Sequence, residues 1–157
     1  MSPRPDLSMS IEDVATFLEG PHVGILSTMD RKGFPHSVGI YYLPRVHEEP
    51  FEFDMWVYAK SQKARNVVRD PHAALLVEKG EPYEDLRGVL VRGMGVVIDN
   101  RDEVFDLGRE IYERYFFPRT GIPIDEGAAQ RIVQQSAKRV ILRLVSRRIA
   151  SWDHSKG

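Results

Sequence analysis

The stretch YAKSQKARNVVRDP, residues 58–71, sets the end of an apolar strand against the start of a short helix. Ser61 is of a residue type that caps helix N-termini, because its hydroxyl accepts a hydrogen bond from a free backbone N–H. Three cations, Lys60, Lys63 and Arg65, crowd this start. Cations are unfavourable there by about 0.3–1 kcal/mol, because the helix dipole is positive at its N-terminus. Their position therefore needs an explanation.

A bound anion would explain the three cations. Helix N-termini bind phosphate through their free N–H groups and the dipole, and lysine and arginine add charge. Asn66 lies one turn beyond Lys63 on a compatible face and can add a polar contact. The alternative is a solvated basic surface whose charge is offset by Asp70 or Glu78. The sequence has neither a P-loop nor a dinucleotide-binding glycine motif, so an anion site here would be of another kind.

The rest of the chain is dominated by segments with the alternation or apolar content of β-strands. There are six of them, at residues 22–29, 35–43, 51–59, 72–78, 87–99 and 138–152. Successive strands read as hairpin neighbours, with helices interrupting them. This order predicts a mainly β (α+β) fold, a six-stranded antiparallel β-barrel with peripheral helices. Gly93 and Gly95 inside the fifth strand predict a bend or bulge.

Helix signals occur at four places. A short helix is expected after the N-cap Ser10, and Asp70-Pro71 should end the helix at 61–69. Apolar side chains at helical spacing predict two more helices, from about Asp102 to Phe117 and over about 125–136.

Composition limits the class of protein. The 157 residues indicate one domain, residues 10–157, after a lead-in, residues 1–9, whose two prolines predict disorder. The net charge of −1 gives no strong field to attract nucleic acid or an acidic membrane. The absence of cysteine excludes disulfides and thiolate metal sites, and the five histidines show no metal-ligand spacing. No stretch approaches the roughly 18 apolar residues of a membrane helix. We therefore expect a cytoplasmic protein with no metal and with neither nucleic acid nor membrane as a partner.

Several motifs together resemble a known family. They are SQKARNV (61–67) followed by Asp70-Pro71, the turn DRKGFP (30–35) followed by HSV (36–38), and RGV (87–89) with Gly93 beyond it. In this order and spacing they resemble the flavin and deazaflavin oxidoreductase superfamily, the pyridoxamine 5′-phosphate oxidase-like FMN-binding split-barrel proteins. The resemblance covers residues 10–100 well. The tail ASWDHSK (150–156) is similar to the end of the branch that uses the deazaflavin coenzyme F420.

The resemblance implies a split-barrel homodimer with a cofactor site along the dimer interface. The cofactor would be coenzyme F420 or, as the alternative, FMN, with its phosphate held by Lys63. The resemblance places Trp152 in the site from the other subunit or as a residue that closes the pocket. The cofactor-binding residues implied are Ser37, Val38, Val57, Tyr58, Ala59, Lys60, Ser61, Gln62, Lys63, Asn66 and Trp152.

The function implied is an F420-dependent oxidoreductase that transfers a hydride between F420 and a small organic acceptor. Two alternatives stay open: an FMN-dependent flavoprotein, and a non-catalytic protein that binds a flavin or tetrapyrrole. The chain lacks the C-terminal arginine-and-histidine pattern of true pyridoxamine 5′-phosphate oxidase, which argues against that substrate. The cofactor would carry the chemistry, and the proton donor could be Tyr58, His36 or solvent.

Overall fold

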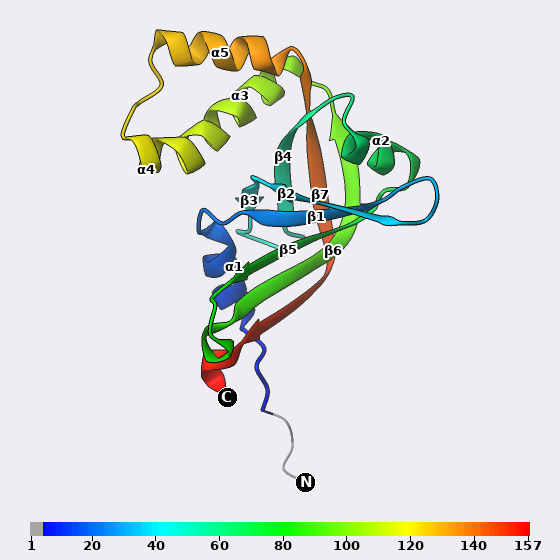
Figure 1. The fold of residues 1–157 in the computed structure, drawn as a ribbon, viewed down its shortest axis with the longest axis vertical. Helices are drawn as coiled ribbons and strands as arrows, with labels where there is room; N and C mark the ends of the chain where they lie inside the picture. The colour runs from blue at the N-terminus through cyan, green and yellow to red at the C-terminus, as the bar shows by residue number, and fades with distance from the viewer. Residues whose placement is uncertain (1–4) are drawn as a thin grey trace.

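The computed structural model describes residues 5–157, and its centre is one sheet of seven antiparallel strands (Figure 1). Their order across the sheet is β2-β1-β5-β6-β7-β4-β3. The strands are β1 (Gly24–Met29), β2 (Pro35–Ile40), β3 (Leu43–Arg45), β4 (Glu52–Tyr58), β5 (His72–Lys79), β6 (Arg87–Ile98) and β7 (Arg139–Asp153). The prediction of a mainly β (α+β) fold with an antiparallel sheet is confirmed.

The number of strands was predicted wrongly, because the expected strand at 35–43 is divided. Two residues, Tyr41 and Tyr42, connect β2 at one edge of the sheet to β3 at the other. A link of this length reaches at most about 11 Å, so the sheet must curl until its edges meet. Tyr42 makes the corner: its ring is fully buried and its hydroxyl donates to the Leu18 carbonyl at 3.0 Å. The chain therefore has seven strands and not six.

Strand β4 lies between two hydrophobic layers. Phe53, Met55 and Val57 alternate along it and are buried in the main core inside the curled sheet. Trp56 points to the other face and packs in a second cluster with Ile141 of β7. Both faces of the middle of β4 are thus covered, whereas Tyr58 at its end is exposed.

Helices surround the sheet, and three of them gather at one end of it (Figure 1). A π-helical turn, η2 (Tyr112–Phe116), joins the third helix to the fourth, and short 3-10 turns lie at η1 (Tyr83–Asp85) and η3 (His154–Lys156). None of the helices in the described part of the chain is long and apolar enough to cross a membrane. The helices are α1 (Ile11–Glu19), α2 (Gln62–Arg69), α3 (Arg101–Ile111), α4 (Phe117–Thr120) and α5 (Glu126–Ser136).

The lead-in differs from the expectation of disorder over residues 1–9. Residues 1–4 lie outside the described residues. Residues 5–9 run beside the end of β7, where the Asp153 N–H donates to the Leu7 carbonyl at 2.8 Å. The Met9 N–H donates to the Ser151 hydroxyl at 3.0 Å. These contacts order the segment, so the prediction is wrong for residues 5–9.

The predicted bulge is confirmed at Gly93. The pairing of β6 with β7 shifts register between Arg92 and Gly93, and Arg147 is the extra residue on β7. A Cβ atom on Gly93 would lie 2.0 Å from the Val145 carbonyl oxygen, so only glycine fits there. The bulge bends both long strands and helps the sheet to curl.

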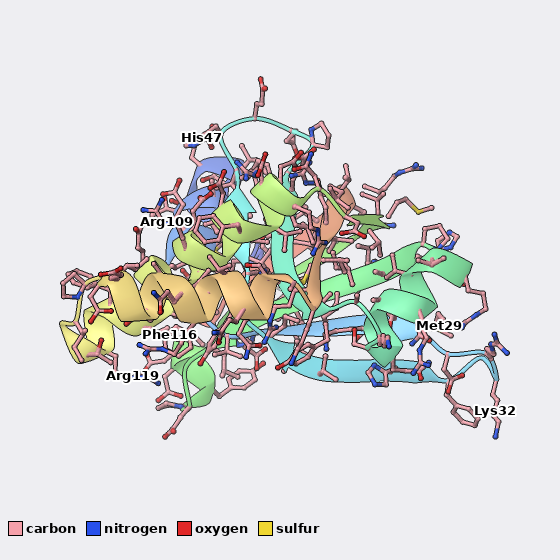
Figure 2. The ribbon with its side chains drawn as sticks, turned by 90° about the horizontal axis from the view of Figure 1, so that it is seen from above. Met29, Lys32, His47, Arg109, Phe116 and Arg119 are labelled. Atoms are coloured by element: carbon pink, nitrogen blue, oxygen red, sulfur yellow. The ribbon has the colours of Figure 1, made fainter. Side chains whose placement is uncertain are left out.

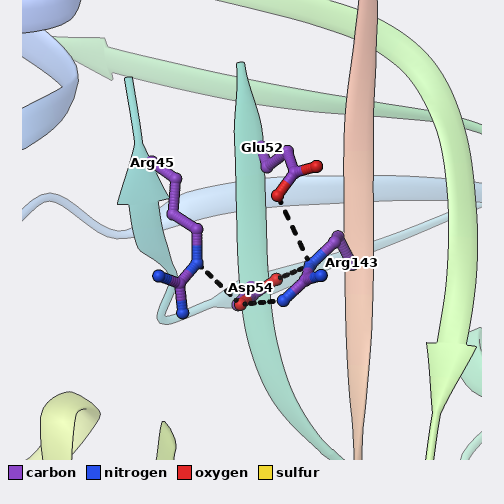
Figure 3. A network of polar contacts seen from close by, with 4 residues as sticks. All are labelled: Arg45, Glu52, Asp54 and Arg143. Atoms are coloured by element: carbon purple, nitrogen blue, oxygen red, sulfur yellow. Dashed lines mark hydrogen bonds and ion pairs between the residues drawn. The ribbon is translucent and has the colours of Figure 1, made fainter. Parts of the chain in front are cut away.

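A buried carboxylate ties three strands together (Figure 3). Asp54 on β4 has no exposed surface. Arg143 of β7 donates to it through Nε at 2.7 Å and Nη2 at 2.9 Å, and Arg45 of β3 donates through Nε at 3.2 Å. Glu52 lies farther out, with 3.7 Å between its Oε2 and the Arg143 Nε. This network holds the short edge strand β3 in place.

We expect Asp54→Asn to destabilise the protein by about 3–5 kcal/mol, because the substitution leaves Arg143 without its buried counter-charge. Urea denaturation measures the free energy of unfolding. The matched control is Glu52→Gln, which removes a more exposed carboxylate from the same arginine and should cost less than about 1 kcal/mol. Equal losses in the two variants would contradict a special role for the buried carboxylate.

Candidate functional site

The start of α2 has the geometry expected from the sequence. The Ser61 hydroxyl accepts a hydrogen bond from the Ala64 N–H at 3.3 Å, so the predicted N-cap is confirmed. Asp70 ends the helix, and its N–H donates to the Asn66 carbonyl at 2.8 Å. Lys63 lies in the first turn and is half-buried. The cation is therefore positioned where helix N–H groups and the helix dipole also favour an anion.

Asn66 holds α2 against the sheet. Its side chain is fully buried, its Nδ2 donates to the Thr28 hydroxyl at 3.0 Å, and its Oδ1 accepts from Gln62 Nε2 at 2.7 Å. No surface of Asn66 is open to a ligand in this chain. Asn66 therefore positions the helix that carries Lys63, and its expected contact with the cofactor stays a prediction.

A cavity of about 350 Å³ opens between the ends of β2 and β4 and the helices α3 and α5. We call it the aromatic pocket. Of the residues expected at the cofactor, it brings together Val57, Tyr58 and Lys63. Its lining consists of Gly39, Ile40, Tyr41, Trp56, Val57, Tyr58, Lys63, Gly108, Ile111, Tyr112, Phe116, Ile132 and Arg139.

Arg139 is the second cation of the aromatic pocket. Its guanidinium carbon lies 4.3 Å from the centre of the Trp56 ring and 4.0 Å from that of Tyr58. Its Nη1 donates to the Trp56 carbonyl at 3.0 Å, whereas its buried Nε has no hydrogen-bond partner within residues 5–157. In the described part of the chain, no carboxylate lines the pocket and no ion pair involves Lys63 or Arg139.

The electrostatics of the pocket favour an anion. Burial lowers the pKa of the Lys63 ammonium, and the nearby Arg139 charge lowers it further. Burial also lowers the pKa of the Arg139 guanidinium, although Tyr58 acts in the opposite direction. Two half-buried cations without a counter-charge are unfavourable, and a bound anion would relieve both effects.

The π-helical turn η2 forms the roof of the pocket, and hydrogen bonds to the end of α1 hold it in place. Arg114 donates to three carbonyls at the end of α1, at 2.7 Å to Glu19, 2.6 Å to Gly20 and 3.1 Å to Leu18. On the pocket side, the rings of Tyr112 and Phe116 stack with centroids 5.6 Å apart. π-Helical turns are frequent at functional sites, because they redirect side chains within a helix.

Comparison with known proteins identifies the family. Residues 10–153 match the pyridoxamine 5′-phosphate oxidase family. The chain belongs to this family. The resemblance to the flavin and deazaflavin oxidoreductases is thereby confirmed. A search of curated proteins found no significant match.

Some solved structures of similar fold are named for the cofactor that the protein uses or binds. The chain is 34% identical to the conserved hypothetical protein Rv2991 from Mycobacterium tuberculosis, with a TM-score of 0.83 over 99% of this chain and 92% of that one. An F420 reductase is 24% identical, with a TM-score of 0.62 over 85% and 93% of the two chains. A FAD-binding protein from Mesorhizobium loti is 15% identical, with a TM-score of 0.62 over 92% and 94%. At these lower identities the similarity shows the fold alone.

The other residues expected at the cofactor do not line the aromatic pocket. Lys60 is exposed beside the helix start, and Val38 packs partly against the core. The Ser37 hydroxyl lies 2.8 Å from that of Ser27. Ala59 and Gln62 line a separate hollow of about 570 Å³, which also includes Arg31, Arg65 and Arg69.

Trp152 lies far from the aromatic pocket within one chain. It stands at the opposite end of β7 from Arg139, roughly 40 Å along the strand at ~3.3 Å per residue. Its ring covers Gly88, where a Cβ atom would lie 2.3 Å from Trp152 Cζ2. Trp152 therefore does not close the pocket of its own chain, and only its expected contribution to the other subunit's site stays a prediction.

Sequence reasoning missed Arg139. Arg139 is the first residue of β7 and pairs with Tyr58 of β4, a contact between residues far apart in the sequence. One local signal existed at Gly108, in the middle of α3. A Cβ atom there would lie 2.8 Å from the Trp56 ring, so the glycine marks where the helix closes over the pocket. No group of three or more metal-ligating side chains occurs among the residues described.

We expect Arg139→Gln to raise the pKa of the Lys63 ammonium. Burial is the main cause of the lowered pKa, and the substitution removes the second cause, the positive charge of Arg139. A ¹³C NMR titration of the Lys63 Cε in the free protein measures this shift. Phosphate affinity in the wild type should fall as pH rises through the lowered pKa, since only charged Lys63 attracts the anion. Arg65→Gln, which removes an exposed cation from the same helix, is the control and should leave the Lys63 pKa unchanged. An unmoved pKa in Arg139→Gln would mean that the two cations do not share one pocket.

Proposed function

We propose that the protein is an F420-dependent oxidoreductase that transfers a hydride between the deazaflavin and a small organic acceptor. The observation that carries the proposal is the pair Lys63 and Arg139, which lies in an aromatic-walled pocket with no carboxylate in its described lining. Family membership supports a flavin-type oxidoreductase, and the similarity to an F420 reductase favours F420. The tail resemblance at residues 150–156 points the same way.

The residues present fit the cofactor. Lys63, together with Lys60 and the capped start of α2, would hold the phosphate that both F420 and FMN carry. The ends of β2 and β4 would support the ring at the mouth of the aromatic pocket, beside Tyr58. When bound, either cofactor supplies the hydride chemistry through its ring.

The chain itself would position the acceptor and exclude water. Ile111 and Ile132 are buried and close the inner wall of the pocket against solvent. Tyr58 lines the pocket with its hydroxyl near Gln135, at 3.5 Å, and is the better placed of the two expected proton donors. His36 is not among the residues that line the pocket.

FMN remains the second candidate cofactor. The family is named for a flavin enzyme, and a FAD-binding protein shares the fold. A side-by-side fluorescence titration of the purified protein with F420 and with FMN decides between them. Micromolar or tighter binding of F420 alone supports the proposal, and a preference for FMN replaces it with the flavoprotein function. Binding of both without turnover of any acceptor would favour a carrier.

In the same titration, Lys63→Ala should weaken cofactor binding by about 1.5–3 kcal/mol, as expected for the loss of a charged hydrogen bond. The matched control is Lys32→Ala, because Lys32 lies in the β1–β2 turn on the opposite side of the molecule from Phe116 (Figure 2). Lys32→Ala should leave the affinity unchanged. Equal affinity of Lys63→Ala and wild type would remove the phosphate role from Lys63.

We also propose that the protein is a homodimer, as the family resemblance implies. A largely apolar groove of about 500 Å³ on β1, β5 and β6 supports this, with Ala74, Gly93 and Met94 among its lining residues. A second copy seated on this groove would exclude water from it. The expected contribution of Trp152 to the other subunit's site requires such an assembly.

Light scattering at micromolar concentration should therefore give the mass of a dimer. Met94→Lys should shift the mass toward that of a monomer, because it adds a third cation to a groove that already contains Arg92 and Arg147. Val133→Lys introduces the same charge on an exposed position of α5 and should leave the dimer intact. A monomeric wild-type protein would overturn the dimer proposal.

A further inference from the structure

Arg139 carries a charge that the described residues do not compensate. Its Nη1 donates to the Trp56 carbonyl at 3.0 Å, and its Nε is buried without a hydrogen-bond partner among residues 5–157. No described carboxylate forms an ion pair with it. The Trp56 and Tyr58 rings beside the guanidinium restrict its movement. A guanidinium held in this way binds an anion with a smaller loss of side-chain freedom than a lysine does.

The walls beyond Arg139 are aromatic and apolar. Trp56, Tyr112 and Phe116 line both the aromatic pocket and an adjoining hollow of about 220 Å³. The exposed polar surface of this adjoining hollow is minimal, so its interior favours an apolar group. The aromatic pocket, with its aromatic walls and Arg139, suits a ligand with a flat ring at one end and an anion at the other.

Lys63 and Arg139 reach the same pocket from different elements. Lys63 stands in the first turn of α2, where helix N–H groups favour a phosphate. Arg139 stands at the start of β7, beside the indole of Trp56. With a cofactor phosphate at the helix start, Arg139 would be the cation left to pair with a second ligand.

We propose that the aromatic pocket binds the acceptor as an aromatic carboxylate, whose carboxylate pairs with Arg139 and whose ring lies against Trp56, Tyr112 and Phe116. This proposal identifies the substrate class of the proposed oxidoreductase. Calling the bound ligand an acceptor depends on that function. The binding itself requires no cofactor, so it is testable separately.

The test compares 4-nitrobenzoate with its neutral methyl ester as ligands of the cofactor-free protein. The chain has two tryptophans, so Trp152→Phe leaves Trp56 as the fluorescent reporter inside the pocket. We expect saturable quenching by both compounds, with the acid bound about tenfold more tightly because it alone forms the charged pair. Equal affinity for acid and ester would overturn the proposal. This comparison requires no substitution of a pocket residue.

Substitutions in the same background assign the contacts. Arg139→Gln should weaken binding of the acid about tenfold and binding of the ester less than about threefold. Arg139→Lys should retain only part of the affinity for the acid, because lysine lacks the planar guanidinium. Lys63→Ala is the matched cation control and should weaken the acid less than Arg139→Gln does. Phe116→Ala should weaken acid and ester alike, since it removes only the aromatic contact. An Arg139→Gln protein that folds, by circular dichroism, and binds the acid like wild type would overturn the assignment.

Adding F420 to the acid complex of the wild-type protein, with the fluorescence of F420 as the readout, distinguishes this proposal from the proposed function. If F420 binds alongside the acid, both proposals are supported. If F420 expels the acid, the acid occupies the cofactor's place and the substrate assignment fails. If F420 does not bind while the acid still discriminates through Arg139, the carboxylate pocket stands and the F420 function fails.

Discussion

The connection through Tyr41 and Tyr42 is the constraint on which the rest of the structure depends. It joins the two edge strands, β2 and β3, so the sheet has to curl. Tyr42 fills the inside of the resulting corner, and Tyr41 stacks on Tyr115 of the π-helical turn at 4.3 Å between ring centres. The Tyr115 hydroxyl in turn donates to the Tyr42 carbonyl at 3.0 Å. The corner that closes the sheet therefore also positions the roof of the aromatic pocket.

Two arginines of β7 show how the fold separates structure from binding. Arg143 and Arg139 lie four residues apart on the same face of the strand. Hydrogen bonds that Arg143 donates to Asp54 raise the pKa of Arg143, and its charge is satisfied inside the protein. Burial lowers the pKa of Arg139, which has two aromatic rings and a carbonyl beside it but no carboxylate among the residues described. The first arginine stabilises the sheet, whereas the second remains available to a ligand.

Features that depend on neighbouring residues could be predicted from the sequence. The Ser61 cap, the end of α2 at Asp70-Pro71 and the bulge at Gly93 each follow from local backbone rules, and each is present. Features that depend on distant contacts could not be predicted. The segment 5–9 is ordered because it pairs with the end of β7, and β3 exists because Arg45 reaches the buried Asp54. Arg139 enters the site only because β7 pairs with β4, which no local pattern indicates.

The site is encoded in separate parts of the chain. Strands β1 to β6 and Lys63 come from residues up to about 100, where the motifs of the family lie, and β7 brings Arg139. The roof of the aromatic pocket comes from the helical segment 101–136, which is held to α1 through Arg114 and covers Trp56 through Gly108. A change in the helical segment would alter the shape of the aromatic pocket without moving Lys63. In a protein built this way, the sheet and α2 position Lys63, and the helices after residue 100 shape the pocket beside it.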